Sequence, residues 1–399
     1  MTNMKQLSDV KNKDLFAIVS VGYNRLSSQR RLLSSLLRAD YTGYDSIPLV
    51  ISIDNGGNKE LEDYADNFEW PYGDKYVIKH QERLGLKNHI LSCGDLTQFF
   101  KGVILLEDDI YVAEGFYDYT IQVEKYYGDC PQVASMALYA NEMNGFVWLP
   151  MTKLRNAADV TAGQAVASWG EAWNTRMWSE FREWLAKTTI PWNEIDMPHQ
   201  IKEWTKAWSK FFDAYMVMEG KYSINPYTSL TTNFSDAGEH GSANNTVVQV
   251  SLQQGRRQYQ FLPLAQLVKY DIYSNNLLLH DVLGLSREEV CLDLYGVRPN
   301  DKNCRFILTV KRLPYKVIHS YGLYMRPHEL NVIEDIPGND IYLYDTTEKD
   351  RKPKGGRMAG RIIYYLHGFN FRFLPLAFWA NCCILFKKVM DRIKKRIKF

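Results

Sequence analysis

The stretch Gly102-Val-Ile-Leu-Leu-Glu-Asp-Asp-Ile110 joins an apolar run to three consecutive carboxylates. Residues 102–106 predict a buried strand, and Glu107, Asp108 and Asp109 follow at its carboxyl end. In an open α/β sheet, ligands bind beyond the carboxyl ends of the strands. Because adjacent negative charges repel one another, a divalent cation that also binds a diphosphate would suit this position. The alternative is an acidic turn exposed to water.

Strand-like and helix-like segments alternate on both sides of this stretch. Strands are predicted over residues 15–21, 49–53, 76–79, 102–106 and 133–138, and helices over residues 27–39, 59–67, 86–100 and 114–127. Alternation at this spacing is typical of βαβ units and a mostly parallel sheet flanked by helices. The sequence therefore predicts an α/β, Rossmann-like fold.

The second half of the chain is less regular. Tryptophans are frequent between residues 161 and 242, where helices are predicted over 171–185 and 200–218. Short strands are predicted over 305–311, 315–319 and 341–344, and a helix over 286–294. The expected domains are a large domain over 1–250 with halves at about 15–140 and 160–250, a smaller C-terminal α+β region over 251–347, and a linker with a basic amphipathic tail over 348–399.

Composition excludes some classes of function. The 399 residues carry a formal net charge of +2, which gives no reason to expect binding to nucleic acid. The six cysteines show no CxxC pair and no zinc-ligand spacing, so a reducing cytoplasm is the expected setting. The first residues lack the apolar segment of a signal peptide, and no apolar run is long enough to span a membrane.

Two other predicted strands also end in polar residues. Tyr23 and Arg25 follow the first strand in Val19-Ser-Val-Gly-Tyr-Asn-Arg25, and Asp54 follows the second in Ile51-Ser-Ile-Asp-Asn-Gly-Gly57. Tyr23 could stack on a base, Arg25 could reach a phosphate, and Asp54 could accept a hydrogen bond from a base or a ribose. Ordinary turns would explain the same Gly and Asn residues.

Four segments occur in the order seen in family 2 glycosyltransferases of the GT-A fold: AIVSVGYNR (17–25), ISIDNGG (51–57), ERLGLKNHIL (82–91) and VILLEDDIYVAEGFYDY (103–119). The last is especially similar to N-acetylglucosaminyltransferase I and its relatives. The resemblance implies a GT-A fold and an inverting, metal-dependent transfer of a sugar, in surface polysaccharide or glycolipid synthesis. The implied donor is a nucleotide sugar, with a UDP-sugar favoured, the acceptor a saccharide or a polyprenyl-linked saccharide, and the cofactor Mn²⁺ or Mg²⁺.

The resemblance also implies roles for individual residues. Asp109 would bind the metal ion, and His240 in a late loop would close over the diphosphate and the metal. The implied donor-binding residues are Tyr23, Arg25, Asp54, Arg83, Lys87, Glu107, Asp108 and the sugar-stacking Trp169. A tryptophan at helical spacing is more often part of a core, and a single histidine is usually not a ligand.

The general base of an inverting enzyme must reach the acceptor hydroxyl on the face opposite the leaving diphosphate. The resemblance favours Asp213, in Phe211-Phe-Asp-Ala-Tyr215, where the family has a pair of acids and this chain has one. Glu171, in Ser168-Trp-Gly-Glu-Ala-Trp173, is the alternative. Either could instead be an ordinary helix carboxylate, with Glu171 in a first turn favoured by the helix dipole.

The C-terminal residues combine apolar and basic character. Residues 373–386 (FLPLAFWANCCILF) are apolar, and residues 387–399 hold seven Lys or Arg and one Asp. This combination is typical of a helix that lies on an anionic membrane surface. It predicts a cytoplasmic protein that is peripheral to the inner face of the cell membrane. Docking of the helix on the protein itself or on a second copy in an oligomer is the alternative.

Two further functions remain open from the sequence. A metal-dependent sugar nucleotidyltransferase shares the fold class, but it would carry a Gly-rich loop with Lys or Arg after the first strand, and residues 22–25 (GYNR) do not form one. A non-catalytic scaffold subunit that binds a nucleotide sugar is the other.

Overall fold

The computed structural model describes Leu7, Val10 and residues 13–236, 248–299, 304–353, 358–366 and 371–397. The N-terminal elements are β1 (Phe16–Gly22), α2 (Leu26–Leu37), β2 (Leu49–Ile53), α3 (Lys59–Asn67), β3 (Lys75–Lys79), α4 (Gly85–Gly94), β4 (Gly102–Glu107), β5 (Ile110–Val112), α5 (Phe116–Tyr127) and β6 (Val133–Ala137). The middle elements are β7 (Met143–Asn144), β8 (Leu149–Pro150), β9 (Val160–Gly163), β10 (Glu171–Asn174), α6 (Thr175–Lys187), α7 (His199–Lys202), α8 (Ser209–Met218), β11 (Tyr222–Pro226), β12 (Thr231–Asn233) and β13 (Lys269–Tyr270).

One large sheet organises both of these groups. Within the described ranges its nine strands run in the order β13-β9-β11-β6-β10-β4-β1-β2-β3. Five of the described strand pairs in it are parallel and three are antiparallel. Every residue of β1, β2 and β6 is buried, which is why these strands read as continuous apolar runs. The predicted α/β class with a mostly parallel sheet is confirmed.

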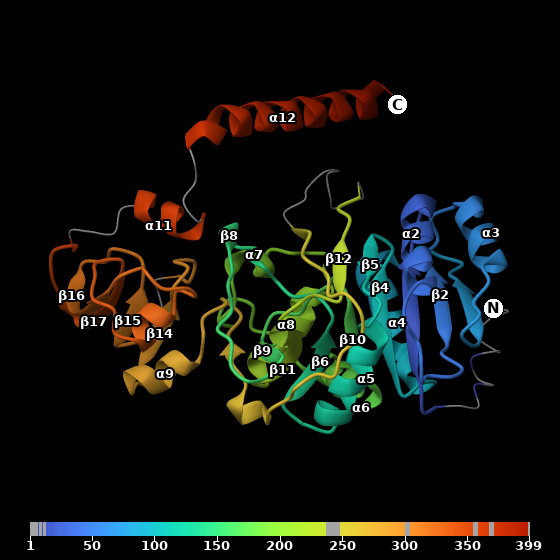
Figure 1. The fold of residues 1–399 in the computed structure, drawn as a ribbon, viewed down its shortest axis with the longest axis horizontal. Helices are drawn as coiled ribbons and strands as arrows, with labels where there is room; N and C mark the ends of the chain where they lie inside the picture. The colour runs from blue at the N-terminus through green and yellow to red at the C-terminus, as the bar shows by residue number, and fades with distance from the viewer. Residues whose placement is uncertain are drawn as a thin grey trace.

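A second, smaller sheet follows toward the C-terminus. Its elements are α9 (Leu278–Leu283), β14 (Val290–Asp293), β15 (Phe306–Thr309), β16 (Tyr315–Tyr321), α10 (Leu330–Ile333) and β17 (Ile341–Lys349). The strands run in the order β14-β15-β17-β16. Figure 1 shows this sheet at the opposite end of the molecule from β2 and α3. The predicted smaller C-terminal region is therefore a mixed sheet of its own.

Side chains alternate across the small sheet and so form two separate cores. Val290, Leu292, Leu308 and Leu343 belong to one apolar cluster. Their neighbours in the chain, among them Cys291, Ile307, Tyr342 and Tyr344, belong to another cluster. This division follows from the two-residue period of a strand, which sends successive side chains to opposite faces.

Three predicted helices are wrong in whole or in part. Residues 171–174 form β10, which pairs antiparallel with both β4 and β6, and the helix α6 begins only at Thr175. Strand pairing in the centre of the sheet overrides the helix preference of Glu and Ala in this segment. No helix forms over 286–294, because residues 287–289 form a turn and residues 290–293 form β14. The helix predicted over 200–218 is interrupted, since residues 203–208 are a loop between α7 and α8.

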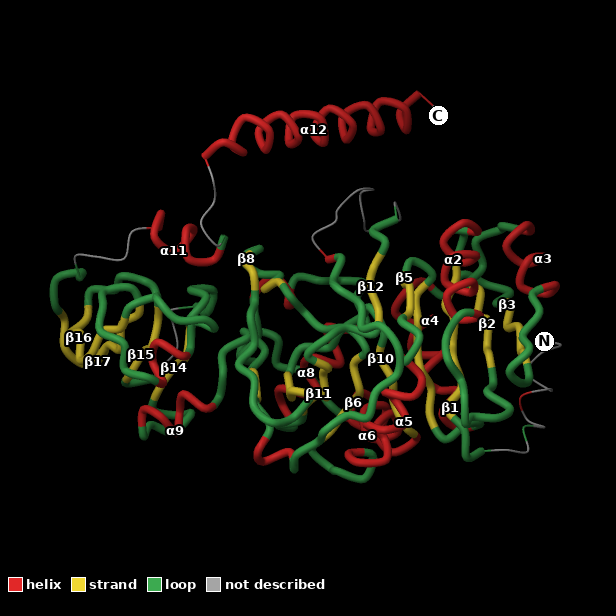
Figure 2. The backbone as a smooth tube through the Cα atoms, viewed as in Figure 1, coloured by secondary structure: helices red, strands yellow, loops and turns green. Residues whose placement is uncertain are grey.

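The C-terminal segments are the helices α11 (Met358–Tyr365) and α12 (Leu374–Ile397). Figure 2 shows α12 apart from the rest of the described chain, above the sheets in this view. Its apolar side chains are open to solvent: Phe378 is 74% exposed, Trp379 63% and Phe386 66%. In the part of the chain that is described, no helix combines the length and the apolar character needed to cross a bilayer.

Candidate active site

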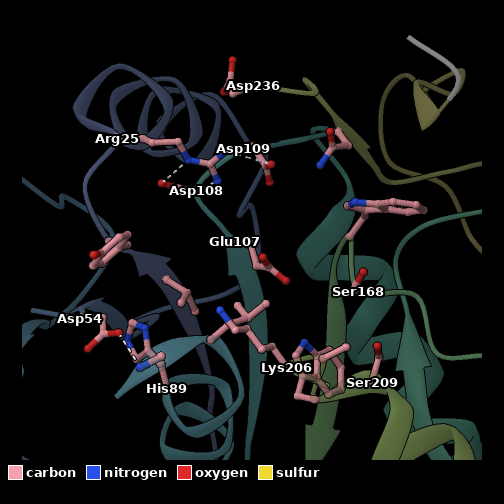
Figure 3. Close-up of a pocket in the computed structure, with 18 of the residues that line it drawn as sticks. Arg25, Asp54, His89, Glu107, Asp108, Asp109, Ser168, Lys206, Ser209 and Asp236 are labelled. Carbon is pink, nitrogen blue, oxygen red and sulfur yellow. Dashed lines mark hydrogen bonds and ion pairs between the residues drawn. The ribbon is translucent and has the colours of Figure 1, made fainter. Parts of the chain in front are cut away.

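The carboxyl ends of β2, β1 and β4 meet at one edge of the large sheet. The strand register pairs Gly22 with Ile53 and Val21 with Glu107, so the residues that follow each strand converge. They line a cavity of about 1200 Å³ (Figure 3). We call this side the strand-end wall; it consists of Val21, Gly22, Tyr23, Asn24, Arg25, Asp54, Arg83, Gly85, Leu86, His89, Glu107, Asp108 and Asp109.

Residues from the middle of the chain form the opposite side of the cavity. Figure 3 shows Ser168 and Ser209 across from the strand-end residues. We call this side the tryptophan wall; its described residues are Trp148, Ser168, Trp169, Glu203, Trp204, Thr205, Lys206, Ala207, Trp208, Ser209 and Val248. Asn233, Ser235 and Asp236 also line the cavity, but they lie at the end of β12 beside the strand-end acids (Figure 3). The structure thus brings together elements that are far apart in sequence.

Arg25 lies directly against the acids at the end of β4. Its Nε donates to Asp108 Oδ2 at 3.1 Å, a second guanidinium nitrogen donates to Asp108 Oδ1, and its Nη1 lies 3.3 Å from Asp109 Oδ2. Burial raises the pKa of Asp108 to about 6, although the guanidinium opposes this shift. Arg25 therefore acts as an internal cation for the acidic pair in this structure.

Glu107 points into the middle of the cavity (Figure 3). Burial raises its pKa to about 8, and the charges of Asp109 and Asp108 add to the rise. A carboxyl group with such a pKa holds its proton for much of the time near neutral pH. Glu107 can therefore donate a hydrogen bond to a ligand oxygen as well as accept one.

Asp54 organises the loop before α4. Its carboxylate accepts hydrogen bonds from the backbone N–H groups of Asn55, Leu84 and Gly85, at 2.9, 2.8 and 2.9 Å. Gly85 has a φ of +73°, a conformation that glycine adopts readily. The Arg83 guanidinium, on the same loop, lies 4.9 Å from the centroid of the Tyr23 ring. Asp54, Arg83 and Tyr23 thus form one recess of the strand-end wall.

His89 also lines this recess, and the sequence patterns did not identify it. Its Nε2 lies 2.8 Å from the Ser52 hydroxyl, and burial lowers the pKa of the imidazole to about 4. The ring is therefore neutral at physiological pH. A histidine inside an apolar helix carries no local sign that distinguishes a cavity wall from a core, so only the tertiary structure reveals it.

Three tryptophans give the opposite wall its character. Trp169, which the sequence predicts as a stacking residue, lines the cavity. The centroid of its ring lies 4.8 Å from that of the Tyr139 ring. Trp148 and Trp204 also line the cavity, and they are 57% and 42% exposed. Large aromatic side chains so open to solvent inside a concave site are typical of ligand-binding surfaces.

Two lysines differ in their placement. Lys206 lines the cavity and makes no ion pair or hydrogen bond with any residue in the described ranges. Lys87, which the resemblance assigned to the donor, is not among the lining residues, and its Nζ lies 4.1 Å from the Phe211 ring centroid. The accessible cation on this part of the wall is therefore Lys206.

The two predicted bases are buried behind the cavity and do not line it. Asp213 Oδ1 accepts the backbone N–H of Val166 at 2.8 Å, and burial raises its pKa well above the usual value. Glu171 accepts the Ser223 hydroxyl at 2.9 Å, and burial raises its pKa to about 8. Neither is the helix-surface carboxylate that the sequence left open. His240 lies outside the described residues.

The acids after β4 can contribute to a metal site only in part. No three His, Cys, Asp or Glu side chains within the described ranges converge closely enough to hold an ion by themselves. Mg²⁺ and Mn²⁺ in nucleotide enzymes, however, take only one or two carboxylates and complete their shell with phosphate oxygens and water. The Asp109 side chain is 17% exposed at the cavity, so it fits the role of a single protein ligand.

No family model and no curated protein matches the sequence. Similar solved structures include Staphylococcus aureus TarS 1-349 in complex with UDP-GlcNAc, at 12% identity and a TM-score of 0.35 over 57% of this chain and 60% of that one. GalNAc-T7 with UDP, GalNAc and Mn²⁺ is 14% identical, with a TM-score of 0.38 over 53% of this chain and 42% of that one. The Pyrobaculum calidifontis mannosyltransferase PcManGT with GDP-Man and Mn²⁺ is 14% identical, with a TM-score of 0.34 over 56% of this chain and 59% of that one. The chain thus spans less than two thirds of each of these proteins.

Proposed function

We propose that this protein is a GT-A-type glycosyltransferase that moves a sugar from a nucleotide-sugar donor to a saccharide acceptor. One observation carries the proposal: a single cavity joins an aromatic and cationic recess, a run of acids at a strand end, and a facing wall of exposed tryptophans. The recess suits a nucleotide, the acids suit a diphosphate with its cation, and the tryptophans suit sugar rings.

The strand-end wall would hold the donor. Tyr23 and Arg83 would stack on the base, with a uracil base favoured, while Asp54 keeps their loop in place. Asp109 would bind Mn²⁺ or Mg²⁺ together with the diphosphate, and the ion would neutralise the leaving group. Arg25 and Lys206 carry positive charge to the same region, and Glu107 would contact the donor sugar.

Inversion requires a base on the acceptor side of the sugar. The described carboxylates that line the cavity outside the strand-end wall are Glu203 and Asp236. Asp236 already accepts the Ser28 hydroxyl at 2.7 Å and pairs with Arg31. Glu203 has only a 3.8 Å contact with His199 and is exposed, so we propose Glu203 as the base in place of the buried Asp213 and Glu171.

The exposed apolar face of α12 supports a membrane-associated acceptor. In the sequence, residues 387–399 carry seven basic residues and one acid. A polyprenyl-linked saccharide at an anionic cytoplasmic membrane surface would satisfy both features. Truncation after Leu366, which keeps α11 and removes α12, should abolish co-sedimentation with vesicles that contain phosphatidylglycerol; retained sedimentation would refute this part of the proposal.

The central test is a thermal-shift screen with UDP-, GDP- and CMP-sugars, with and without Mn²⁺. We expect one nucleotide class to raise the melting temperature, and Mn²⁺ to increase that shift. Asp109→Asn should remove the additional rise in melting temperature that Mn²⁺ produces. Glu203→Gln should keep donor binding while turnover falls. A screen in which no nucleotide sugar stabilises the protein would refute the proposed function.

A further inference from the structure

The hairpin β7–β8 lies between the two sheets of the molecule (Figure 1). Its strands pair through Met143 with Pro150 and through Asn144 with Leu149. Asn144 closes the turn, because its carbonyl accepts the Trp148 N–H at 2.9 Å and its side chain accepts the Phe146 N–H at 2.9 Å. The turn thus has a defined conformation that presents Trp148.

The hairpin contacts both cores. Phe146 packs against the core of the large sheet. Val147, Leu149 and Met151 pack instead against the cluster on one face of the small sheet. Trp148 lies between these residues in sequence and lines the cavity. The apolar residues that hold the hairpin to the small sheet and the tryptophan that enters the cavity therefore alternate along one short segment.

The backbone at Trp148 is itself unusual. Its φ is +55°, in the left-handed region that non-glycine residues rarely adopt. A residue stays in such a conformation only when its surroundings impose it. Here the surroundings are the packing of Val147 and Leu149 on the small sheet and the hydrogen bonds to Asn144.

A buried polar network makes a second connection to the small-sheet region. Leu154 N–H donates to the Tyr270 hydroxyl at 2.7 Å, and that hydroxyl donates to Glu329 Oε1 at 2.8 Å. Asn276 Nδ2 donates to the same oxygen at 3.1 Å. Glu329 is 1% exposed, so its carboxyl group serves this network rather than solvent. The chain that leaves β8 is therefore fixed on the C-terminal side of the hairpin as well.

A second exposed tryptophan of the cavity, Trp204, comes from a different part of the chain. It lies in the loop between α7 and α8 and lines the same cavity, beside Glu203 and Thr205. A sugar ring offers apolar C–H faces and a rim of hydroxyl groups. Indole rings can stack on these faces, and the Glu203 carboxylate and the Thr205 hydroxyl can form hydrogen bonds with the sugar hydroxyl groups.

We propose that the small-sheet region positions Trp148 so that it forms, with Trp204, the binding subsite for a pyranose ring of the acceptor. This inference rests on the proposed function, because it assigns one wall of that cavity to the acceptor. It gives residues 278–349 a role in acceptor selection through the hairpin rather than through contact with the donor.

Fluorine NMR of the protein labelled with 5-fluorotryptophan tests the subsite. The chain has ten tryptophans, and Trp148→Phe and Trp204→Phe identify the two resonances concerned. Methyl glycosides of glucose, galactose, mannose and N-acetylglucosamine are titrated to about 50 mM, since single sugar rings bind with millimolar affinity. At least one glycoside should shift both resonances and leave most others in place.

The outcomes separate the subsite from the donor chemistry. If no glycoside shifts the two resonances, or if all tryptophans shift alike, the subsite is refuted. If a glycoside shifts them while no nucleotide sugar raises the melting temperature, the subsite stands and the glycosyltransferase assignment fails.

A pair of matched variants tests the positioning role. Leu149→Ala removes a contact between the hairpin and the small sheet, whereas Ile307→Ala removes a side chain from the opposite face of that sheet. Leu149→Ala should weaken glycoside affinity at least fivefold and broaden the Trp148 resonance, with nucleotide-sugar affinity unchanged. Ile307→Ala should leave both affinities within twofold. Equal effects of the two variants on glycoside affinity would refute positioning by the hairpin.

Discussion

Replacing Glu171 by glutamine should make the stability of the protein less dependent on pH. Glu171 is 1% exposed in the centre of the large sheet, and its carboxyl oxygens accept the Ser223 hydroxyl at 2.9 Å and the Ala167 N–H at 3.3 Å. Burial raises its pKa from 4.5 to about 8. Glutamine keeps the shape of the side chain and has no proton to lose.

The sign of the effect follows from the raised pKa. The unfolded chain releases the Glu171 proton near pH 4.5, whereas the folded chain keeps it until about pH 8. The stability that the protonated group contributes is therefore complete below pH 4.5 and is lost as pH rises toward 8. At about 1.4 kcal/mol per pKa unit, the loss is on the order of 5 kcal/mol over this range and about 3 kcal/mol at pH 7.

Urea denaturation of the wild type and of Glu171→Gln at pH 5, 6, 7 and 8 measures the effect. The wild type should lose more stability than the variant with each step. Asp213 is buried in both proteins, and the charge of Glu171 adds to the rise of its pKa in the wild type, so the variant also loses this coupling. The variant should also keep its turnover, because Glu171 does not line the cavity. A stability difference that is the same at pH 5 and pH 8 would refute the assigned protonation, and loss of turnover with donor binding intact would make Glu171 the base.

Three further predictions concern packing and the strand-end wall. Gly94→Ala should cost about 1–3 kcal/mol in denaturant titrations, because the new Cβ would lie 2.2 Å from a Trp178 ring atom; an unchanged midpoint would contradict that packing. Asp54→Asn should weaken nucleotide-sugar binding by about tenfold in calorimetry, since a backbone N–H loses its carboxylate partner, and an unchanged affinity would show that the loop keeps its shape without it. Arg25→Gln leaves Asp108 without its cation, so Mn²⁺ should raise the melting temperature of the variant more than that of the wild type; equal shifts would show that the guanidinium and the ion do not compete.

The strands behind the strand-end wall are predictable from sequence, because in each of them a buried apolar run ends sharply at polar residues. β1, β2 and β4 are apolar runs that end abruptly at residues with turn or acidic character. A parallel sheet then brings those ends to one edge, whatever the details of packing. This is why Tyr23, Arg25, Asp54 and the acids after β4 could be grouped before their positions were known.

The segments behind the tryptophan wall are less predictable, because their local sequence patterns conflict with their positions in the tertiary structure. Glu171-Ala-Trp173 reads as the start of a helix, but these residues pair with β4 and β6 in the sheet. The sequence does contain a sign that the helix begins later, at Thr175. Asn174 caps α6 by accepting the Met177 N–H at 2.8 Å, and asparagine is a preferred residue at this position.

Trp148 carries no local sign of its role. Its place in the cavity depends on a hairpin turn and on a sheet that begins more than a hundred residues later in the chain. No short pattern encodes a contact of that range. The arrangement of Arg25 against Asp108 is similarly invisible, since either residue alone suits a phosphate or a metal ion.

The antiparallel strand β10 has a consequence for how this chain can be divided. β4 and β6 are consecutive long strands of the N-terminal half, yet β10 separates them in the sheet. Among the described strands, β6 pairs only with β10 and β11, and both of these come from the other half. A fragment that ends near residue 140 would leave β4 with a bare edge and β6 without a neighbour. The two halves of the cavity should therefore unfold in one transition, and neither should fold as a separate module.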